Sequence, residues 1–441
     1  MSVPQARPPL PRAIRALFFV RLINSMGNFV FPFLTMLLTV KLGYSKTAAG
    51  AFMSTAAFAA GLAILAGGKI ADAFGRKRTI AALQIAAALL LGLCAVLGLV
   101  PIVPLLIAIS YVLLQASWPV FNALVADIAP AESRKRAYAL LYWGNNIGFS
   151  LGPIMAGYLF NAHASYMFIG NAVSLAAVSA ILIFGAKVTR PAEAGPGAGE
   201  DSLPAEPDAD ACDGASDGAC AEACDDAEPP VDEAKTGGSL LGILRERPIL
   251  IAFAAVNFLM NFVYQQHLFG LPVFLNDALG SRGPAVYGMV MTTNGLTVVL
   301  LTALVTTLLA RARSSVNMAV AALFYAVGFG LLFFCSSAAA VLASTAIWTI
   351  GEIVSATNAQ VFIASLSPCS HRGRVNAFVM FITGWGATLA PVASGAYASR
   401  FGSRAVWPAV AGLALLASVL MALIARREGL RAGRSPRRRS A

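Results

Sequence analysis

The feature that most constrains this chain is a series of twelve long apolar segments along its 441 residues. They cover residues 15–40, 48–71, 79–100, 102–126, 137–160, 164–186, 248–275, 285–309, 315–336, 338–366, 375–398 and 404–425. A helix of about 20 apolar residues crosses the hydrocarbon core of a bilayer. Only 12% of the residues are charged, about half the share in soluble domains, which argues against a soluble enzyme, a nucleic-acid-binding protein or a secreted disulfide scaffold. We expect an all-α polytopic membrane protein with twelve transmembrane helices.

Basic residues are distributed unevenly between the loops that connect these segments. With the N-terminus in the cytoplasm, the cytoplasmic segments carry 26 Lys and Arg residues and the opposite side carries five. This asymmetry follows the positive-inside rule. We therefore expect a multi-pass protein of a bacterial-type inner (plasma) membrane, with both termini cytoplasmic. Its surroundings are the lipid bilayer, and its basic tail is interpreted as a membrane anchor rather than a site for nucleic acid.

The segment between the sixth and seventh apolar runs is acidic. Residues 187–247 hold 15 of the 21 Asp and Glu residues and five of the 32 Lys and Arg residues. Such a composition cannot bury enough apolar surface to offset its chain entropy, so we expect a disordered cytoplasmic linker. Cys212, Cys220 and Cys224 lie in it without a Cys-x-x-Cys pair, which is only weak evidence for a metal site. We predict no metal site.

An internal repeat divides the chain at this linker. A shift of 238 residues aligns seven pairs: Gly50 with Gly288, Pro130 with Pro368, Arg134 with Arg372, Arg136 with Arg374, Gly148 with Gly386, Pro153 with Pro391 and Gly157 with Gly395. Since glycine and proline have specific backbone consequences, chance agreement is not expected. We expect two pseudo-symmetric six-helix halves around a central cavity, related by an axis along the membrane normal. The expected parts are an N-terminus at 1–14, halves at 15–186 and 248–425, the linker at 187–247 and a tail at 426–441.

The turn after the second apolar run has a specific pattern. It reads Gly68-Lys69-Ile70-Ala71-Asp72-Ala73-Phe74-Gly75-Arg76-Lys77-Arg78. This run resembles the G-x-x-x-D-[RK]-x-G-R-[RK] signature of the major facilitator superfamily, with Ala73 in place of the usual base. The turn from Asp127 to Arg134 is similar to another cytoplasmic turn of that superfamily. The resemblance covers both halves and implies the fold of the superfamily, with a cytoplasmic latch formed by Gly68, Asp72, Gly75 and Arg76 and assisted by Asp127 and Arg134.

The fifth apolar run contains closely spaced small residues and a proline. It reads Gly148-Phe149-Ser150-Leu151-Gly152-Pro153-Ile154-Met155-Ala156-Gly157. Small residues four apart allow a neighbouring helix to approach closely, and proline kinks a helix. The run resembles the G-x-x-x-G-P-x-x-G-G element of the drug:proton antiporter branch, which implies that Gly148, Gly152, Pro153 and Gly157 help the halves to seal. The arginine that such exporters often carry in the fourth span is absent.

Few ionisable residues lie inside the apolar runs. An ionisable group at mid-membrane is costly and is therefore a functional candidate by default. Glu352 is the leading proton-coupling candidate, because a carboxyl group within a span can load and release a proton. His267, Arg21 and Asp277 are further candidates. Structural roles stay open for Glu352 and His267, and Arg21 could instead extend to the cytoplasmic interface.

Amide and aromatic side chains recur within the spans. Amides that faced lipid would be unsatisfied, so we expect them to face a wet cavity or another helix. The cavity candidates are Asn24, Asn28, Phe33, Trp118, Asn122, Tyr142, Asn146, Tyr264, Gln265, Asn294, Trp348, Asn358 and Trp385. A lining rich in aromatics and amides, with one acid, suits amphipathic or weakly cationic small molecules.

These observations predict a secondary active transporter that works by alternating access. We expect proton-coupled export of small amphipathic compounds by a monomer, with protons and a small-molecule substrate as partners. There is neither a P-loop nor an H-E-x-x-H pattern, so we expect no enzyme activity, no cofactor and no metal. Two alternatives remain open: a porter for a specific metabolite, and a non-transporting sensor or docking protein that uses the acidic linker.

Overall fold

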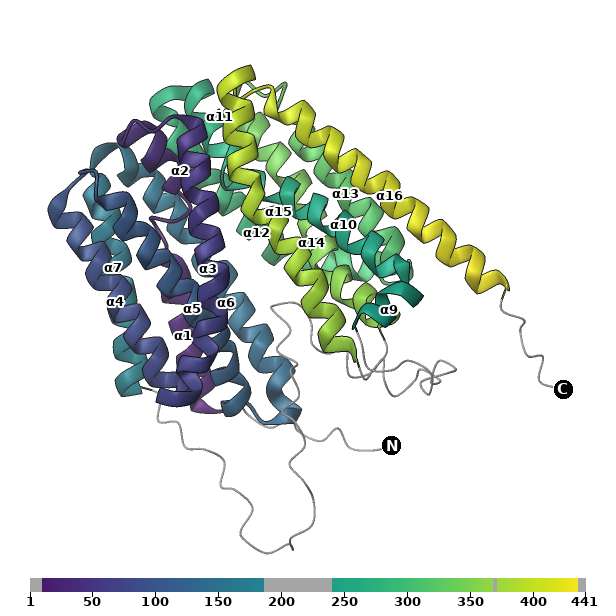
Figure 1. Cartoon of the computed structure of the whole chain (residues 1–441). Helices are drawn as coiled ribbons and strands as arrows, with labels where there is room; N and C mark the ends of the chain where they lie inside the picture. The colour runs from purple at the N-terminus through teal and green to yellow at the C-terminus, as the bar shows by residue number, and fades with distance from the viewer. Residues whose placement is uncertain (1–9, 186–239, 368–370, 435–441) are drawn as a thin grey trace, which may run out of the picture. The chain divides into compact units, whose positions relative to one another are not determined.

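The computed structural model describes residues 10–185, 240–367 and 371–434, and within them every regular element is a helix (Figure 1). Most of the acidic linker, with its three cysteines, and both extreme termini lie outside the described residues. The aligned Pro368 also lies outside them. The N-terminal part contains α1 (Arg12–Met26), α2 (Leu34–Met36), η1 (Leu37–Lys41), α3 (Lys46–Phe74), α4 (Arg76–Leu97), α5 (Val103–Ile128), α6 (Ala131–Ala162), α7 (Ala164–Ala180) and η2 (Ile181–Gly185).

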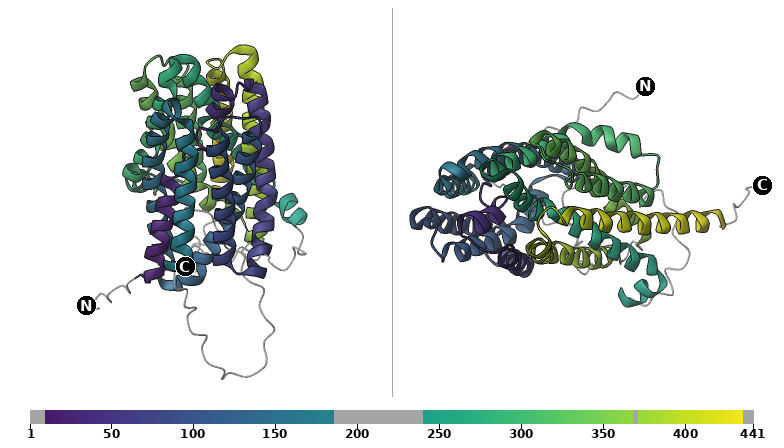
Figure 2. Two further views of the ribbon diagram at one scale, coloured as in Figure 1. Left: turned by 90° about the vertical axis from the view of Figure 1, so that its left-hand side faces the viewer. Right: turned by 90° about the horizontal axis from the view of Figure 1, so that it is seen from above.

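The C-terminal part repeats this order after a short additional helix. It contains α9 (Leu240–Glu246), α10 (Pro248–Tyr264), η3 (Gln265–His267), α11 (Gly270–Leu279), η4 (Gly280–Arg282), α12 (Gly283–Leu309), α13 (Ser314–Leu331), α14 (Ala338–Leu366), α15 (Arg372–Phe401) and α16 (Val406–Arg434). Within each part the long helices run side by side (Figure 2). Helices dominate because every backbone N–H and C=O group in hydrocarbon must be satisfied within the protein.

Nine helical segments of the described residues are long and apolar enough to cross a membrane, and one of them, residues 248–309, covers two of the expected spans. Helix is present in each of the twelve ranges expected from the sequence. Two of the expected spans are not continuous helices. The first is interrupted after Met26 and the seventh after Tyr264. Gly27 ends α1, and Pro32, which follows closely, has no N–H to extend a helix.

The two interruptions are related by the internal repeat. A shift of 238 residues moves the end of α1 at Met26 onto the end of α10 at Tyr264. The same shift moves residues 32–41 onto residues 270–279, the range of α11. The repeat is therefore present in the backbone and not only in the glycines and prolines that revealed it.

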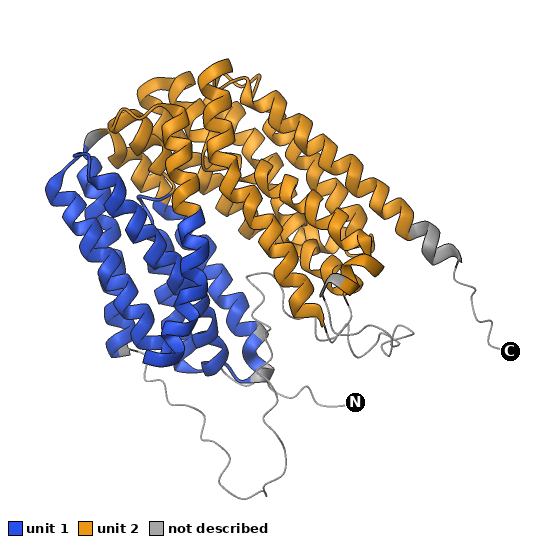
Figure 3. Cartoon of the chain, in the orientation of Figure 1, with its two compact units in different colours: residues 1–31, 58–152, 162–217 blue, residues 32–57, 153–161, 218–441 orange. Residues whose placement is uncertain are grey.

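The chain forms two compact units (Figure 3). Unit 1 comprises Met1–Phe31, Phe58–Gly152 and Ala162–Asp217, and unit 2 comprises Pro32–Ala57, Pro153–Asn161 and Gly218–Ala441. The boundary between them passes through α3 and α6. The beginning of α3 and the last part of α6 therefore pack with helices of the C-terminal part.

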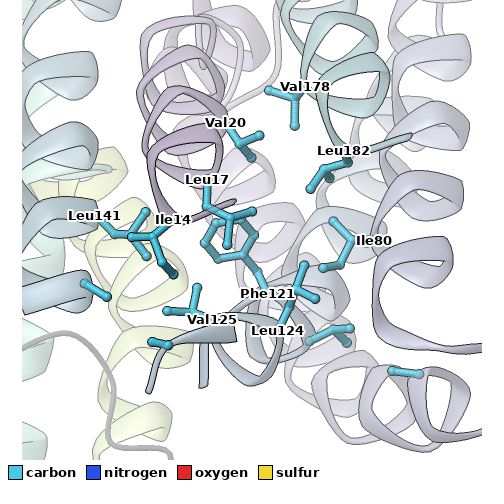
Figure 4. Close-up of a cluster of buried hydrophobic side chains, with 14 residues drawn as sticks. Ile14, Leu17, Val20, Ile80, Phe121, Leu124, Val125, Leu141, Val178 and Leu182 are labelled. Carbon is cyan, nitrogen blue, oxygen red and sulfur yellow. The ribbon is translucent and has the colours of Figure 1, made fainter. Parts of the chain in front are cut away.

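Unit 1 has a buried core where five long helices meet (Figure 4). Its side chains include Ile14, Leu17 and Val20 of α1, Ile80 of α4, Phe121, Leu124 and Val125 of α5, Leu141 of α6, and Val178 of α7. Other apolar side chains of the same helices are exposed, as expected for surfaces that contact lipid. Packing inside the unit, rather than burial from water alone, distinguishes the two sets.

We expect Leu17→Ala to destabilise the protein by about 2 to 5 kcal/mol, because it leaves a cavity in a packed core. The matched change is Leu89→Ala on α4, where the side chain is 70% exposed against 0% for Leu17. It should alter stability by about 0.5 kcal/mol or less. Thermal unfolding in detergent micelles measures both. Equal losses would show that the core in Figure 4 does not stabilise unit 1.

Candidate functional site

Unit 2 contains a cavity of about 380 Å³ beside Glu352. It is lined by side chains from three long helices and the end of a fourth: Asn257, Met260, Asn261, Tyr264, Gln265, Tyr325, Glu352, Ser355, Ala356 and Thr383. Most of these residues carry a polar group. A small cavity with several convergent polar groups is typical of a small-molecule site.

The carboxylate of Glu352 is held by two donors from other helices. Tyr264, the last residue of α10, donates its hydroxyl to Oε1 at 2.7 Å. Asn294 of α12 donates from Nδ2 to Oε2 at 2.6 Å and also lies 3.1 Å from the hydroxyl of Thr349. Hydrogen bonds to both oxygens stabilise the ionised form, and the side chain is partly exposed to the cavity. The arrangement can therefore hold a negative charge or a proton at the cavity wall.

His267 and Trp348 lie behind Tyr264 and line neither this cavity nor the cavity of unit 1. The Nδ1 atom of His267 is 2.6 Å from the carbonyl oxygen of Tyr264, and its ring is 4.4 Å from the Tyr264 ring. The Trp348 ring is fully buried and lies 5.7 Å from the His267 ring. The structure therefore places His267 as support for the end of α10, in line with the structural role left open above.

Unit 1 contains a second cavity, of about 270 Å³. Its lining includes five aromatic side chains and the predicted residues Arg21, Asn24, Asn28 and Trp118. The guanidinium carbon of Arg21 lies 3.3 Å from the centre of the Trp118 ring and 5.1 Å from that of Phe121. Arg21 therefore points into the unit, where its cation–π contacts hold it, and not toward the cytoplasmic interface.

The two cavities occupy equivalent places in the repeat. A shift of 238 residues relates Leu114 to Glu352, Ser117 to Ser355, Trp118 to Ala356 and Asn145 to Thr383, and all eight residues line one of the cavities. The chemistry of the equivalent positions differs. The carboxylate of unit 2 has a leucine as its counterpart, and the tryptophan that stacks on Arg21 has an alanine. Duplication thus produced two similar hollows, one with a cation and one with an anion.

Several predicted cavity residues line neither cavity. Phe33 is buried against Phe160 and Tyr287, and Asn358 accepts a hydrogen bond from Asn317 at 2.8 Å. Asn146 donates to the carbonyl of Tyr142 one turn earlier, and the carbonyl of Asn122 accepts from Tyr138. Trp385, 38% exposed, packs on Phe381. These side chains were proposed because polar and aromatic groups in a span need a partner, and a neighbouring helix supplies it.

Other cavity residues were missed by the sequence analysis. The most informative are Gln84, Gln115, Asn257, Asn261 and Thr383. Asn257 and Asn261 donate to the hydroxyl and the carbonyl of Thr383, at 2.9 and 3.2 Å. Their spacing of four residues places both amides on one face of α10, and this signal was available in the sequence. Gln84 is a single polar residue in a long apolar run, and only the packing of α4 shows where it points.

The predicted cytoplasmic latch has a different ion pair from the one first considered. Arg76 pairs with Asp127 at 2.6 Å and donates to the carbonyl of Ala123, whereas Asp72 is exposed. Gly75 adopts a positive φ of 86°, which a turn this tight requires. Nothing lies within 4 Å of a Cβ placed at Gly68, while one at Gly67 would overlap the Ala116 carbonyl. The close approach of α3 to α5 therefore depends on Gly67.

Arg134 supports the same end of unit 1 through the backbone. Its Nη2 atom lies 3.5 Å from the carbonyl oxygen of Ala126, and the repeat-related Arg372 lies 3.4 Å from the carbonyl oxygen of Ala364. The pairs of residues coincide under the 238-residue shift. Each arginine thus ties the start of one long helix to the end of the preceding one.

The small residues of α6 face two different neighbours. A Cβ at Gly148 or Gly152 would overlap the backbone of α1 at Leu22 or Met26, inside unit 1. A Cβ at Gly157 would lie 2.6 Å from the carbonyl oxygen of Pro284 in α12, inside unit 2. The glycine face predicted from the sequence is therefore a packing face along its whole length.

Two crossings in unit 2 repeat each other residue by residue. Gly288 of α12 packs on the Pro153 carbonyl of α6, and its counterpart Gly50 of α3 packs on the Pro391 carbonyl of α15. The contact between Gly157 and Pro284 likewise corresponds to the contact between Gly395 and the Lys46 carbonyl. Each crossing joins a helix of the N-terminal part to one of the C-terminal part. They form a twofold-related closure at what the predicted topology makes the outer end.

Asp277, predicted as a proton-coupling candidate, belongs to this closure. Its Oδ2 atom is 2.5 Å from Nζ of Lys46 and accepts a hydrogen bond from the Ser403 hydroxyl at 2.6 Å. Thr47 and Ser399 form a further hydrogen bond between α3 and α15. Asp277 thus joins α11, α3 and the start of the last helix, outside both cavities.

We expect Gly50→Val to loosen this closure, because the added side chain would overlap the Pro391 carbonyl. Thr35→Cys, in a background without the native cysteines, reports the change because Thr35 is fully buried. A membrane-impermeant thiol reagent applied from outside should label it several-fold faster in the Gly50→Val protein. Gly61→Val is the matched control on α3, since nothing lies within 4 Å of a Cβ there. Equal labelling in all three proteins would contradict the closure.

Comparisons with known proteins agree with this architecture. The family model of the Major Facilitator Superfamily matches residues 17–368 and 281–440. The chain is 23% identical over 400 residues to a Na(+), Li(+), K(+)/H(+) antiporter of Planococcus maritimus, covering 84% of this chain and 85% of that protein. It is 25% identical over 405 residues to the uncharacterized MFS-type transporter YttB of Bacillus subtilis (strain 168), covering 90% and 91%.

The fold is also similar to that of solved structures. A crystal structure of a POT family transporter in complex with a thioalcohol-conjugated peptide superposes with a TM-score of 0.71 at 15% identity, covering 95% of this chain and 96% of that one. At this identity the likeness concerns the fold alone. Taken with the family match over most of the sequence, the chain belongs to the major facilitator superfamily and is a multi-pass membrane transporter, not an enzyme.

Proposed function

We propose that this transporter couples the movement of a small organic compound to that of protons, and that Glu352 carries the proton. The observation that supports this most directly is the placement of Glu352. Its carboxylate lies within the long helix α14, at the wall of a cavity, with one donor from α10 and one from α12. The other acids whose side chains are described lie at the ends of helices.

The energetic argument follows from the medium. An ionised acid at the centre of a span costs about 2.5 to 3.5 kcal/mol on insertion scales. The hydroxyl of Tyr264 and the amide of Asn294 offset part of this cost while both remain aligned on the carboxylate. A rearrangement of α10 or α12 would remove a donor and favour proton uptake. Protonation and helix arrangement are therefore linked, as proton coupling requires.

The comparison with an antiporter supports exchange with protons over simple diffusion. The relative from Planococcus maritimus exchanges alkali cations for protons, as its name states. We propose alternating access in a monomer with twelve spans, six in each half, and with both termini on the cytoplasmic side of a bacterial-type inner membrane. In this proposal the acidic segment at 187–247 is a tether between halves and takes no part in transport.

The cavities favour a defined metabolite over a broad range of amphipathic cations. Both are rich in amides and hydroxyls, and the cavity of unit 1 has a cation in its wall that would repel a cationic compound. Export of amphipathic compounds remains a second candidate, because Phe31, Tyr111, Phe121 and Phe149 present aromatic surface to the same cavity.

Proton coupling is tested in proteoliposomes that contain a trapped pH-sensitive dye. Unlabelled metabolites and amphipathic cations are added one at a time, and the proton flux that each drives is recorded. We expect at least one compound to drive a flux through the wild type that a protonophore masks. Glu352→Gln should reduce this flux by about tenfold or more, since the amide cannot take up a proton.

The control variant is Glu246→Gln, at an exposed position of α9, which should retain the flux. Exchange of labelled for unlabelled compound needs no net proton movement, so it should persist in Glu352→Gln and show that the variant is folded. An undiminished proton flux in Glu352→Gln would refute the assignment. A wild type that moves compounds without any proton flux would refute the coupling itself.

A further inference from the structure

The cavity of unit 1 has a built polar interior that the proton-coupling proposal does not use. Its volume of about 270 Å³ corresponds to about nine water molecules at ~30 Å³ each. Residues of α1, α4, α5, α6 and α7 contribute to the wall, so the site is surrounded by helices of a single unit. Such a space accepts a compact organic molecule.

Arg21 supplies a positive charge with a defined orientation. Its guanidinium plane lies over the Trp118 ring at 3.3 Å, and the Phe121 ring is 5.1 Å away. Stacking occupies the face of the guanidinium, and its N–H donors point within the plane. That geometry matches the two oxygens of a carboxylate, which an arginine binds through parallel hydrogen bonds.

The lining has no acidic side chain to balance this charge. An anion in a partly apolar cavity is attracted more strongly than in water, because the local dielectric constant is lower. One arginine balances one negative charge, so a monocarboxylate fits better than a doubly charged phosphate. A cationic compound would be repelled from the same position.

Two buried amide oxygens in the wall lack hydrogen-bond partners among the described residues. They are Oε1 of Gln84, a side chain that is 4% exposed, and Oδ1 of Asn28. Two neighbouring amides of the same wall are satisfied, since Asn145 accepts from Ser25 at 2.7 Å and Asn171 accepts from the N–H of Val30. A buried acceptor without a donor costs about 1 to 3 kcal/mol, so a ligand that brings a donor would remove this cost.

We infer that this cavity binds a small organic monocarboxylate that also carries a hydroxyl or ammonium group, such as a hydroxy acid or an amino acid. Arg21 holds the carboxylate, and Gln84 and Asn28 accept hydrogen bonds from the donor group. The inference rests on the proposed function, because the bound compound is taken to be the one transported. It names the class of that compound.

Binding is measured on the purified full chain in detergent by thermal stabilisation and by tryptophan fluorescence. The probes are lactate, phenyllactate, alanine and phenylalanine, each with its uncharged amide and with the acid that lacks the hydroxyl or amino group. We expect at least one of the four acids to bind the wild type, with its amide at least tenfold weaker. Arg21→Gln should lose at least tenfold in affinity, and Arg21→Lys should retain part of it.

Gln84→Leu gives a test that does not remove the charge. It should weaken binding of the hydroxy or amino acid and leave the affinity for the acid without that group unchanged, because only the former brings a donor. Glu352→Gln, in the other cavity, should bind the acid as the wild type does. Size-exclusion chromatography shows that each variant is folded.

The inference is overturned if none of the acids binds, if the amides bind as well as the acids, or if Arg21→Gln leaves the affinity unchanged. Failure of the proposed function looks different. Acids that bind at Arg21 but drive no proton flux would leave this inference in place and remove proton coupling. Proton flux driven by amphipathic cations, with no binding of the acids, would do the reverse.

Discussion

Close contact between helices at glycine is the interaction on which the rest of this structure depends. Lipid is as apolar as the side chains, so helices do not associate to escape water, and dispersion attraction acts only over short distances. Gly50, Gly288, Gly157 and Gly395 each let one helix reach the backbone carbonyl of another. Any side chain larger than hydrogen at these positions would hold the helices apart and remove the contacts on both sides.

Charge is arranged around this packing. Arg21 is stacked on Trp118 in unit 1, and Glu352 is bound by Tyr264 and Asn294 in unit 2. Because an unpaired charge in a span is costly, each group lies where partner groups and a cavity wall are available. The equivalent location of the two cavities in the repeat indicates that duplication produced the hollows and later substitution gave them opposite charges.

The fold class, the family and the absence of enzyme activity were predicted from the sequence and are confirmed. Long apolar runs leave helices as the available backbone structure, and the 238-residue repeat revealed the duplication. The lining of the cavities was predicted less completely. Arg21, Tyr264 and Glu352 were found because polar groups in a span need partners. Gln84 was missed and Phe33 was proposed, because the direction of a single side chain on a mostly apolar helix depends on its neighbours.

The sequence by itself determined where helices form, which loops carry positive charge and which positions repeat, because these follow from local composition and spacing. Only the tertiary structure decided which groups meet. Asp127 rather than Asp72 pairs with Arg76, Gly67 rather than Gly68 lies against α5, and Asp277 binds Lys46 from a segment more than two hundred residues away. The physical reason is that a helix presents residues on all sides. Which side faces a partner is set by how several helices pack together.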